Sequence, residues 1–331
     1  MAQQRQSGKK VIPIETDQDY SLYQSDKKIY SRAVTGKLFT WRWIMIWITQ
    51  IVFYGTPWLI WGDRQAILFD LNAHRFYIFG LVLFPQDLIY LATILIISAL
   101  ALFLFTAVAG RLWCGFACPQ SVYTEMFMWI ERKVEGDRSA RIRLDSTSWT
   151  INKIYKKILK HGIWITLALW TGFTFIGYFA PIRGLFTDLL AWNLGAWQVF
   201  WFAFYSFATY GNAGFMREQV CKYMCPYARF QAVMFDKDTL IVAYDNHRGD
   251  PRGGRSRKDD AKNKGLGDCI DCTLCVQVCP TGIDIRNGLQ YECISCGACA
   301  DVCDSVMKDM GYEPGLVKFT TENGMQNKWS R

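Results

Sequence analysis

Apolar residues are gathered into four long runs in this sequence instead of being spread evenly along it. The stretches 43–61, 88–109, 162–180 and 189–216 contain no charged side chain and are 19, 22, 19 and 28 residues long. An apolar helix of about 20 residues crosses the hydrocarbon core of a bilayer. The pattern therefore predicts four transmembrane helices, and it excludes a purely soluble single domain.

The polar remainder divides the chain into further units. Residues 1–38 are a predicted cytoplasmic arm, residues 39–236 the four-helix membrane domain, and residues 237–267 a flexible cytoplasmic linker rich in glycine and charge. A cysteine-rich domain follows at 268–310, and residues 311–331 form a C-terminal tail. The mean hydropathy of +0.05 is therefore an average over an apolar membrane unit and a charged remainder.

Lysine and arginine indicate how the predicted helices are oriented. The segments 1–38, 111–160 and 217–331 contain seven, ten and sixteen basic residues, whereas the two alternate loops contain two and one. Cytoplasmic loops of membrane proteins have the excess of positive charge. We therefore expect a multi-pass protein with both termini in the cytoplasm. The first 38 residues contain no signal-peptide core, so the first helix is expected to direct insertion.

The same rule accounts for the net charge of +8 without nucleic acid. Glu131, Glu135 and Asp137 interrupt the basic segments, so the chain has no continuous basic stripe of the kind that binds a phosphate backbone. The expected partner of the basic and apolar segments is therefore membrane lipid.

Eight of the twelve cysteines have the spacing of iron–sulfur ligands. The first run has the pattern C-x2-C-x2-C-x3-C-P: Cys269, Cys272, Cys275 and Cys279. The second run repeats the spacing without the proline: Cys293, Cys296, Cys299 and Cys303. In bacterial two-cluster ferredoxins, the fourth cysteine of each run ligates the other cluster. We therefore assign Cys303 to the [4Fe-4S] cluster of the first run and Cys279 to the cluster of the second.

Two other uses of these eight cysteines fit the spacing less well. Zinc needs four ligands but not an evenly spaced triplet, and a cytoplasmic domain does not favour disulfides. The sequence thus predicts a bacterial-type ferredoxin domain of the α+β class with two [4Fe-4S] clusters.

The remaining cysteines form an internal repeat, because each predicted helix pair ends in Cys-x-x-x-Cys-Pro. We call these four residues the cysteine quartet: Cys114, Cys118, Cys221 and Cys225. Two tandem repeats of one orientation predict pseudo-symmetry about an axis along the membrane normal, which would bring the two pairs together. Proline disfavours helix at the cysteine before it and is suited to the first turn of a new helix.

Three chemistries suit the cysteine quartet. Soft thiolates select Cu(I). Cu(II) at the quartet would therefore be a natural electron acceptor, and the quartet would hold the reduced ion. It could instead cycle between dithiol and disulfide, or hold a third iron–sulfur cluster between the repeats. Cysteine is also often buried as a small apolar residue. Two equivalent copies beside a cluster domain favour a functional role, and copper or dithiol redox is preferred.

Histidine excludes one class of electron carrier. The three histidines, His74, His161 and His247, all lie outside the predicted spans, so a bis-histidine haem within the bilayer is excluded. Electron transfer must then use clusters, thiols or a quinone.

Four stretches together resemble a known family. They are WGDRQAILFD (61–70), RLWCGFACPQSVYTEMFMWIER (111–132), YGNAGFMREQVCKYMCPYARFQ (210–231) and CPTGIDIRNGLQYECISCGAC (279–299). They closely resemble the cytochrome c oxidase accessory protein family CcoG, also called RdxA or FixG. The resemblance implies a protein of the bacterial cytoplasmic membrane that reduces Cu(II) to Cu(I) for assembly of cbb3-type cytochrome c oxidase. Carried onto this chain, the eight tail cysteines would bind clusters, and the cysteine quartet would serve copper redox.

The sequence departs from that family at its end. Family members continue into a further membrane helix and an outer immunoglobulin-like domain, whereas only about 28 residues follow Cys303 here. Either a truncated chain or a short variant fits this ending.

The combined expectation is a membrane cupric reductase. A cytosolic donor would reduce the clusters, and a copper chaperone or oxidase assembly factor would receive Cu(I); the oligomeric state is open, with a homodimer as one arrangement. One alternative is a quinol dehydrogenase subunit of the NapH type, which shares the general layout. Another is a non-catalytic copper chaperone or assembly scaffold.

Overall fold

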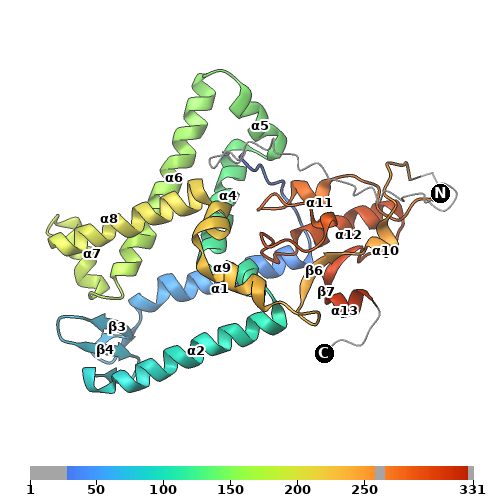
Figure 1. Ribbon diagram of the computed structural model, residues 1–331. Helices are drawn as coiled ribbons and strands as arrows, with labels where there is room; N and C mark the ends of the chain where they lie inside the picture. Colours follow the sequence, from blue (N-terminus) through green and yellow to red (C-terminus); the bar gives the residue numbers. More distant parts are fainter. Residues whose placement is uncertain (1–27, 258–264, 327–331) are drawn as a thin grey trace, which may run out of the picture.

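The computed structural model describes residues 28–257 and 265–326, and the fold is largely helical (Figure 1). The predicted structure of residues 1–27 lies outside the described part of the chain. The longer helices are α1 (Lys37–Gly55), α2 (Leu88–Ala109), α4 (Pro119–Glu135), α6 (Ile151–Ile176), α8 (Ala196–Gly211) and α12 (Ala298–Met310). Shorter α-helices are α3 (Leu112–Phe116), α5 (Arg138–Ser146), α7 (Ile182–Leu190), α9 (Pro226–Met234), α10 (Asn246–Gly249), α11 (Leu274–Gln277) and α13 (Glu322–Met325).

The remaining elements are short helical turns and three small antiparallel sheets. The turns are η1 (Thr56–Trp58), η2 (Pro85–Asp87), η6 (Ile285–Asn287) and the π-helical η3 (Asn212–Met216) and η4 (Val220–Met224). The sheets pair β1 (Ile60–Trp61) with β2 (Arg64–Gln65), join β3 (Ile67–Asp70), β4 (Arg75–Ile78) and β5 (Leu81–Leu83), and pair β6 (Ile241–Tyr244) with β7 (Val317–Thr320).

Each predicted span contains a helix in the structure. By length and composition, one of the described helices, Pro85–Ala109, meets the requirement for crossing a membrane. α1 includes the buried Arg42, and α6 begins with a lysine-rich turn before its apolar part. α8 has only 16 residues and continues into the π-helical turn η3. The structure therefore supports one span directly.

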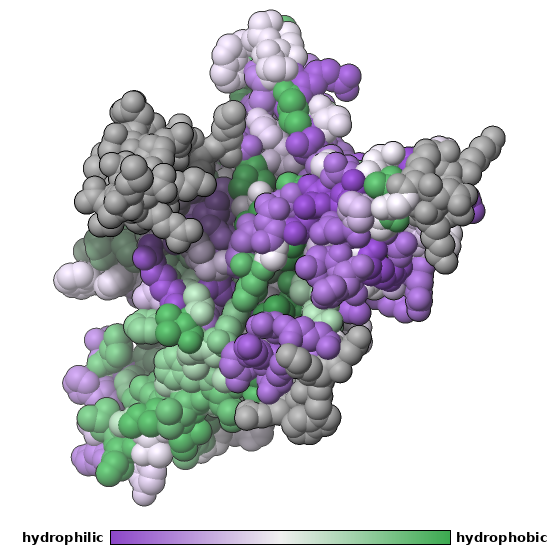
Figure 2. All heavy atoms as spheres, turned by 45° about the vertical axis from the view of Figure 1, so that its right-hand side comes forward, coloured by the Kyte–Doolittle hydropathy of each residue, from purple (hydrophilic) through white to green (hydrophobic). Residues whose placement is uncertain are grey.

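α2 exposes apolar side chains along its whole length. Thr106 is the one residue of α2 that is buried, while leucines, isoleucines and phenylalanines from Leu88 to Val108 are exposed. Figure 2 shows apolar residues gathered over the lower part of the molecule, where α2 lies in Figure 1. A contiguous apolar surface of this length is unfavourable in water, which identifies it as a surface for lipid or protein.

α1 and α2 run between two ends of the molecule. At one end, the β3–β4–β5 sheet follows α1 and meets the end of α6, because Phe69 donates its backbone N–H to Tyr178 at 2.7 Å. At the other end, α1 begins beside α12, and Leu240, just before β6, donates to Val108 in α2 at 3.0 Å. The cysteine-rich domain therefore lies at one end of the helices.

α4 is a core helix that joins the two helix pairs. Phe127 stacks on Trp164 of α6, and both are fully buried. Glu131 is also fully buried and pairs with Arg141 at 3.2 Å and Arg217 at 2.8 Å. Burial opposes ionisation of Glu131, but Arg217, Lys160 and Arg141 outweigh it and lower the pKa of this carboxyl to about 2.

The ferredoxin domain is larger than the predicted 268–310. β6, within the predicted flexible linker, pairs with β7, within the predicted tail, in the register Val242 to Phe319. The described part of the linker also packs on this domain, since Arg248 Nε donates to Asp268 at 2.6 Å and Gly267 donates to Pro251 at 2.9 Å. The prediction of a flexible linker is wrong for residues 241–257, because pairing between distant strands does not appear in local composition.

The first helix begins on a carboxylate of the ferredoxin domain. Asp301 of α12 accepts the backbone N–H groups of Leu38 at 3.2 Å and Phe39 at 2.7 Å. Gly36 fits against the same side chain, leaving no room for a Cβ. The carboxylate accepts hydrogen bonds from the free N–H groups at the start of α1, and its negative charge interacts favourably with the positive end of the helix dipole. This cap fixes the ferredoxin domain to the helical domain.

Removing the cap should loosen that attachment. We expect Asp301→Ala to destabilise the protein by about 1–2 kcal/mol, since two N–H groups at the start of α1 lose their acceptor. Thermal unfolding in detergent should show this as a lower melting temperature. Asp309→Ala, on an exposed position of the same helix, is the control and should unfold like the wild type. Equal melting temperatures for both variants would contradict the capping role.

Candidate functional site

Tight turns position the first run of cysteines. Cys269 and Cys272 lie on a loop, and Cys275 lies on the short helix α11. Asp271 and Thr273 have positive φ angles of 53° and 57°, which turn the backbone between the cysteines. This turn chemistry lets three thiols from seven residues face one space.

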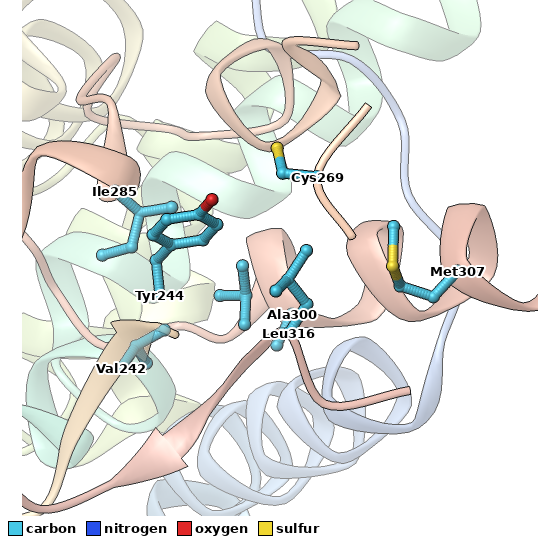
Figure 3. Packing of buried hydrophobic residues seen from close by; sticks show 8 residues of the cluster. Val242, Tyr244, Cys269, Ile285, Ala300, Met307 and Leu316 are labelled. Atoms are coloured by element: carbon cyan, nitrogen blue, oxygen red, sulfur yellow. The ribbon is translucent and has the colours of Figure 1, made fainter. Parts of the chain in front are cut away.

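The first run and Cys303 surround one cavity. Cys269, Cys272, Cys275 and Cys303 line a hollow of about 380 Å³, together with apolar side chains such as Met307. Cys269 belongs to a buried apolar cluster with Ile285 and Leu316. Tyr244 rises from β6 with its hydroxyl directed toward the loop of Cys269 (Figure 3).

The second run and Cys279 surround a second cavity. Cys293, Cys296 and Cys299 line a hollow of about 350 Å³ with Cys279. Ser295 and Gly297 have positive φ angles of 52° and 74°, so the second loop turns in the same way as the first. Cys275 lines both cavities, which are therefore neighbours. Cys303 therefore lies with the first run and Cys279 with the second, while their ligation of the clusters stays a prediction.

The donor set of each cavity suits a [4Fe-4S] cluster. Four free thiols line the first hollow and five line the second, because Cys275 borders both, and most of the other lining residues are apolar. A cubane cluster takes four thiolates at its irons. Burial raises the pKa of Cys275 to about 11 and those of Cys293 and Cys303 to about 12. Without metal these thiols are protonated near neutral pH, so cluster binding must release their protons.

The two Cys-x-x-x-Cys-Pro motifs are similar in local structure, although the first turn is α-helical and the second π-helical. Cys114 lies in the helical turn α3 and Cys221 in the helical turn η4. Cys118 and Cys225 are extended, with ψ of 128° and 108°, and each precedes a helix that begins with proline. The prediction that each proline starts a new helix is therefore confirmed.

The structure brings the cysteine quartet into one electrostatic neighbourhood. Burial and, to a smaller extent, the neighbouring Cys118, Cys114 and Cys225 together raise the pKa of Cys221 to about 12. Cys114 donates to Gln231 Oε1 at 3.3 Å, and burial raises its pKa to about 11. Across residues 28–257 and 265–326, no three His, Cys, Asp or Glu side chains are close enough to hold a single metal ion. A three- or four-thiolate site would therefore require the side chains to converge, whereas a two-thiolate site involves one pair.

Gly115 is the point where the quartet meets the second cluster cavity. A Cβ on Gly115 would lie 2.7 Å from the carbonyl oxygen of Ile294 and 3.0 Å from Cys296 Cα, so only glycine fits. The carbonyl of Gly115 accepts from Arg42 Nε at 3.0 Å. Cys114, the preceding residue, packs against the apolar cluster that contains Ile294 and Cys296. The first motif and the second cavity are therefore in direct contact.

Sequence reasoning missed two polar residues at this contact. Arg111 is buried and donates to the backbone carbonyls of Tyr291 and Ala228. Gln231 is fully buried beside Cys114. The available signal was an arginine three residues before the first motif cysteine, directly after an uncharged span.

Comparisons with known proteins agree with these observations. A family model described as a 4Fe-4S dicluster domain matches residues 216–322, and one described as a 4Fe-4S binding domain matches residues 91–135. The nitrogen fixation protein FixG of Rhizobium meliloti (strain 1021) is 42% identical over 306 residues, which are 91% of this chain and 58% of FixG. Proteins RdxA and RdxB of Cereibacter sphaeroides are each 43% identical over 90% and 91% of this chain and 63% and 64% of their own lengths.

The chain belongs to the FixG/RdxA family. It spans about 60% of the length of these curated relatives. The dicluster match includes both cluster cavities and extends over β6 and β7, in agreement with the larger ferredoxin domain. No solved structure gives a significant match.

The exchanged fourth cysteines can be tested by comparing single variants. Cys279 and Cys296 line the same cavity, so Cys279→Ser and Cys296→Ser should perturb the same cluster. Cys272 lines the other cavity, so Cys272→Ser should perturb the other cluster. Electron paramagnetic resonance of the reduced protein should therefore give one altered spectrum for the first two variants and a different one for the third. Iron should fall from about eight toward about four atoms per chain.

Ser305→Ala, at an exposed position near Cys303, is the control and should keep both signals. If the spectrum of Cys279→Ser instead matches that of Cys272→Ser, each run ligates its own cluster and the assignment is wrong.

Proposed function

We propose that this protein is a membrane-bound iron–sulfur electron-transfer protein that reduces Cu(II) to Cu(I) at the cysteine quartet. The observation that supports this most is the direct contact at Gly115 between the quartet's first motif and the cavity of Cys293, Cys296 and Cys299. When bound and reduced, each cluster supplies one electron, which is what one Cu(II) ion needs. Quartet and cavity are near enough for an electron to pass without a further carrier.

The chemistry of the quartet favours the reduced ion. Soft thiolates bind Cu(I) in preference to harder cations. Burial keeps Cys114 and Cys221 protonated in the metal-free protein, so uptake of Cu(I) displaces protons and depends on pH. The four thiols are only partly buried, which leaves an approach for copper from solvent.

We further propose that α1, α2, α6 and α8 all cross the membrane as two tandem helix pairs. α1 and α2 run between the sheet end and the ferredoxin end, and each helix pair is followed by a Cys-x-x-x-Cys-Pro motif whose proline starts a new helix. Exposed apolar side chains also lie on α1, α6 and α8, including Trp47, Leu169 and Phe207. The basic residues then lie on the ferredoxin side, which makes both termini cytoplasmic.

The biological role proposed for this activity is assembly of cbb3-type cytochrome c oxidase in a bacterial cytoplasmic membrane. It rests on the sequence resemblance to the family. A cytosolic electron donor and a copper-accepting chaperone or assembly factor are the implied partners. This chain corresponds to about 60% of the length of these relatives.

A copper assay tests the proposed reaction. The purified holoprotein is reduced under anaerobic conditions, excess reductant is removed, Cu(II) is added, and Cu(I) is detected with a colorimetric chelator. We expect replacement of all four quartet cysteines by serine to slow Cu(I) formation about tenfold or more while the iron content stays unchanged. Ser98→Ala on the exposed face of α2 is the control and should keep the wild-type rate.

Four results would point elsewhere. An unchanged rate in the quartet variant would overturn the copper site. Cluster reduction by a quinol without Cu(I) formation would favour a quinol dehydrogenase subunit, and Cu(I) binding without Cu(II) reduction would favour a chaperone or scaffold. About twelve irons per chain in the wild type, lowered to about eight in the quartet variant, would assign the quartet to a third cluster. The family model that matches residues 91–135 is itself described as a 4Fe-4S binding domain.

Reporter fusions test the four-span topology. Alkaline phosphatase fused after Asn72 or Trp192, in turns at the sheet end, should be active because it reaches the outer side. The same enzyme fused after Gly136 should be inactive, and a fluorescent protein at that position should fluoresce. Activity after Gly136, or inactivity after Trp192, would contradict this topology.

A further inference from the structure

The buried arginines of this protein differ in how their charge is balanced. Those in the described part of the chain are Arg42, Arg111, Arg141 and Arg217. Arg42 pairs with Glu125 at 3.0 Å, and Arg141 and Arg217 pair with Glu131. No carboxylate of residues 28–257 or 265–326 is within ion-pairing distance of Arg111. A buried charge without a counter-charge is unfavourable, so this side chain needs another anion.

The surroundings of Arg111 identify the available counter-charge. Its Nη atoms donate to the carbonyls of Tyr291 and Ala228, which are neutral, whereas its buried Nε atom has no acceptor. The groups that its charge acts on most are the thiols of Cys114, Cys293, Cys221 and Cys225. Three of these belong to the cysteine quartet, and Cys293 belongs to the second cluster cavity.

Gln231 presents a second unused donor at the same place. Its Oε1 atom accepts from Cys114, but its Nε2 atom is buried and has no acceptor. An unsatisfied buried donor costs about 1–3 kcal/mol and calls for a specific explanation such as a missing ion or ligand. One unused donor therefore lies beside Cys114, and the other belongs to the guanidinium whose charge acts on three thiols of the quartet.

We propose that Arg111 is the counter-cation of the cysteine quartet and that Arg111 Nε and Gln231 Nε2 donate N–H···S hydrogen bonds to its metal-bound thiolates. The inference rests on the proposed copper function. Two thiolates on one Cu(I) ion have a net charge of −1, which the guanidinium balances. Sulfur becomes a good acceptor only when it is deprotonated, so both donors are unused in the metal-free protein and satisfied in the loaded one. Arg111 and Gln231 are thus positioning residues.

Competition for Cu(I) tests this assignment. The reduced holoprotein is titrated with Cu(I) against a colorimetric chelator, and the wild type is compared with Arg111→Gln, Arg111→Lys and Gln231→Leu. We expect about 10- to 100-fold weaker Cu(I) binding for Arg111→Gln, the usual cost of losing an outer-sphere partner. Arg111→Lys should restore part of the affinity because it retains the charge. Gln231→Leu should also weaken binding, although its Nε2 makes no contact in the metal-free protein.

The matched control is Arg229→Gln, which removes one positive charge from an exposed position on α9, two residues from Gln231. It should bind Cu(I) like the wild type. A second readout is the reduction potential of the cluster at Cys293, which Arg111→Gln should lower, since a nearby positive charge stabilises the reduced form. This potential can be measured as long as the Arg111→Gln variant retains its iron. If that variant loses iron, Gln231→Leu tests the donor role independently.

The outcomes separate the two proposals. Wild-type affinity in Arg111→Gln and Gln231→Leu, with full iron content, overturns the donor assignment and leaves the copper function standing. Failure of the wild type itself to bind Cu(I) overturns the copper function and this inference with it.

Discussion

The close approach of Gly115 to the backbone of residues 294–296 is the constraint on which the rest of the arrangement depends. A side chain at this position would separate the first Cys-x-x-x-Cys-Pro turn from the ferredoxin loop, because carbonyl oxygens occupy the space of its Cβ. Arg42 holds the Gly115 carbonyl, and Asp301 caps the helix that contains Arg42. The helix cap, the buried guanidinium and the glycine together fix the distance between the quartet and the second cavity. A shift here would separate the two centres while each stayed intact.

Buried charge gives this arrangement its specificity. Buried ion pairs are weak evidence for stability, since desolvation offsets much of their attraction, but a pair with fixed partners selects one packing over another. Glu125 and Glu131 on α4 bind arginines from three other parts of the chain. α4 therefore fixes α1, α5 and the turn after η3 relative to one another. Arg111 differs, because no carboxylate of residues 28–257 or 265–326 pairs with it and its charge acts on thiols of the quartet and on Cys293.

The four helices proposed to cross the membrane, α1, α2, α6 and α8, differ in mean hydropathy because they differ in how much of their surface packs against other helices. α2 contacts α9 near its own C-terminal end, where Thr106 is its one buried residue, and is apolar on every side, as expected for a helix surrounded by lipid. α6 packs against α8 through Gly172, whose position leaves no room for a Cβ beside Ser206. Helices that pack on one another can include small and polar residues at the contact, so their mean hydropathy falls while their outer faces remain apolar.

The sequence by itself determined the elements that local spacing encodes. Cysteines three residues apart with turn-forming neighbours define cluster loops, a proline after Cys118 or Cys225 starts a helix, and uncharged runs become long helices, because each depends on residues close in the chain. Only the tertiary structure decided what meets across the chain: β6 with β7, Asp301 with the start of α1, and Arg111 with cysteines of three segments. These contacts depend on shape and on the balance of buried charge, which become defined only when distant segments pack together.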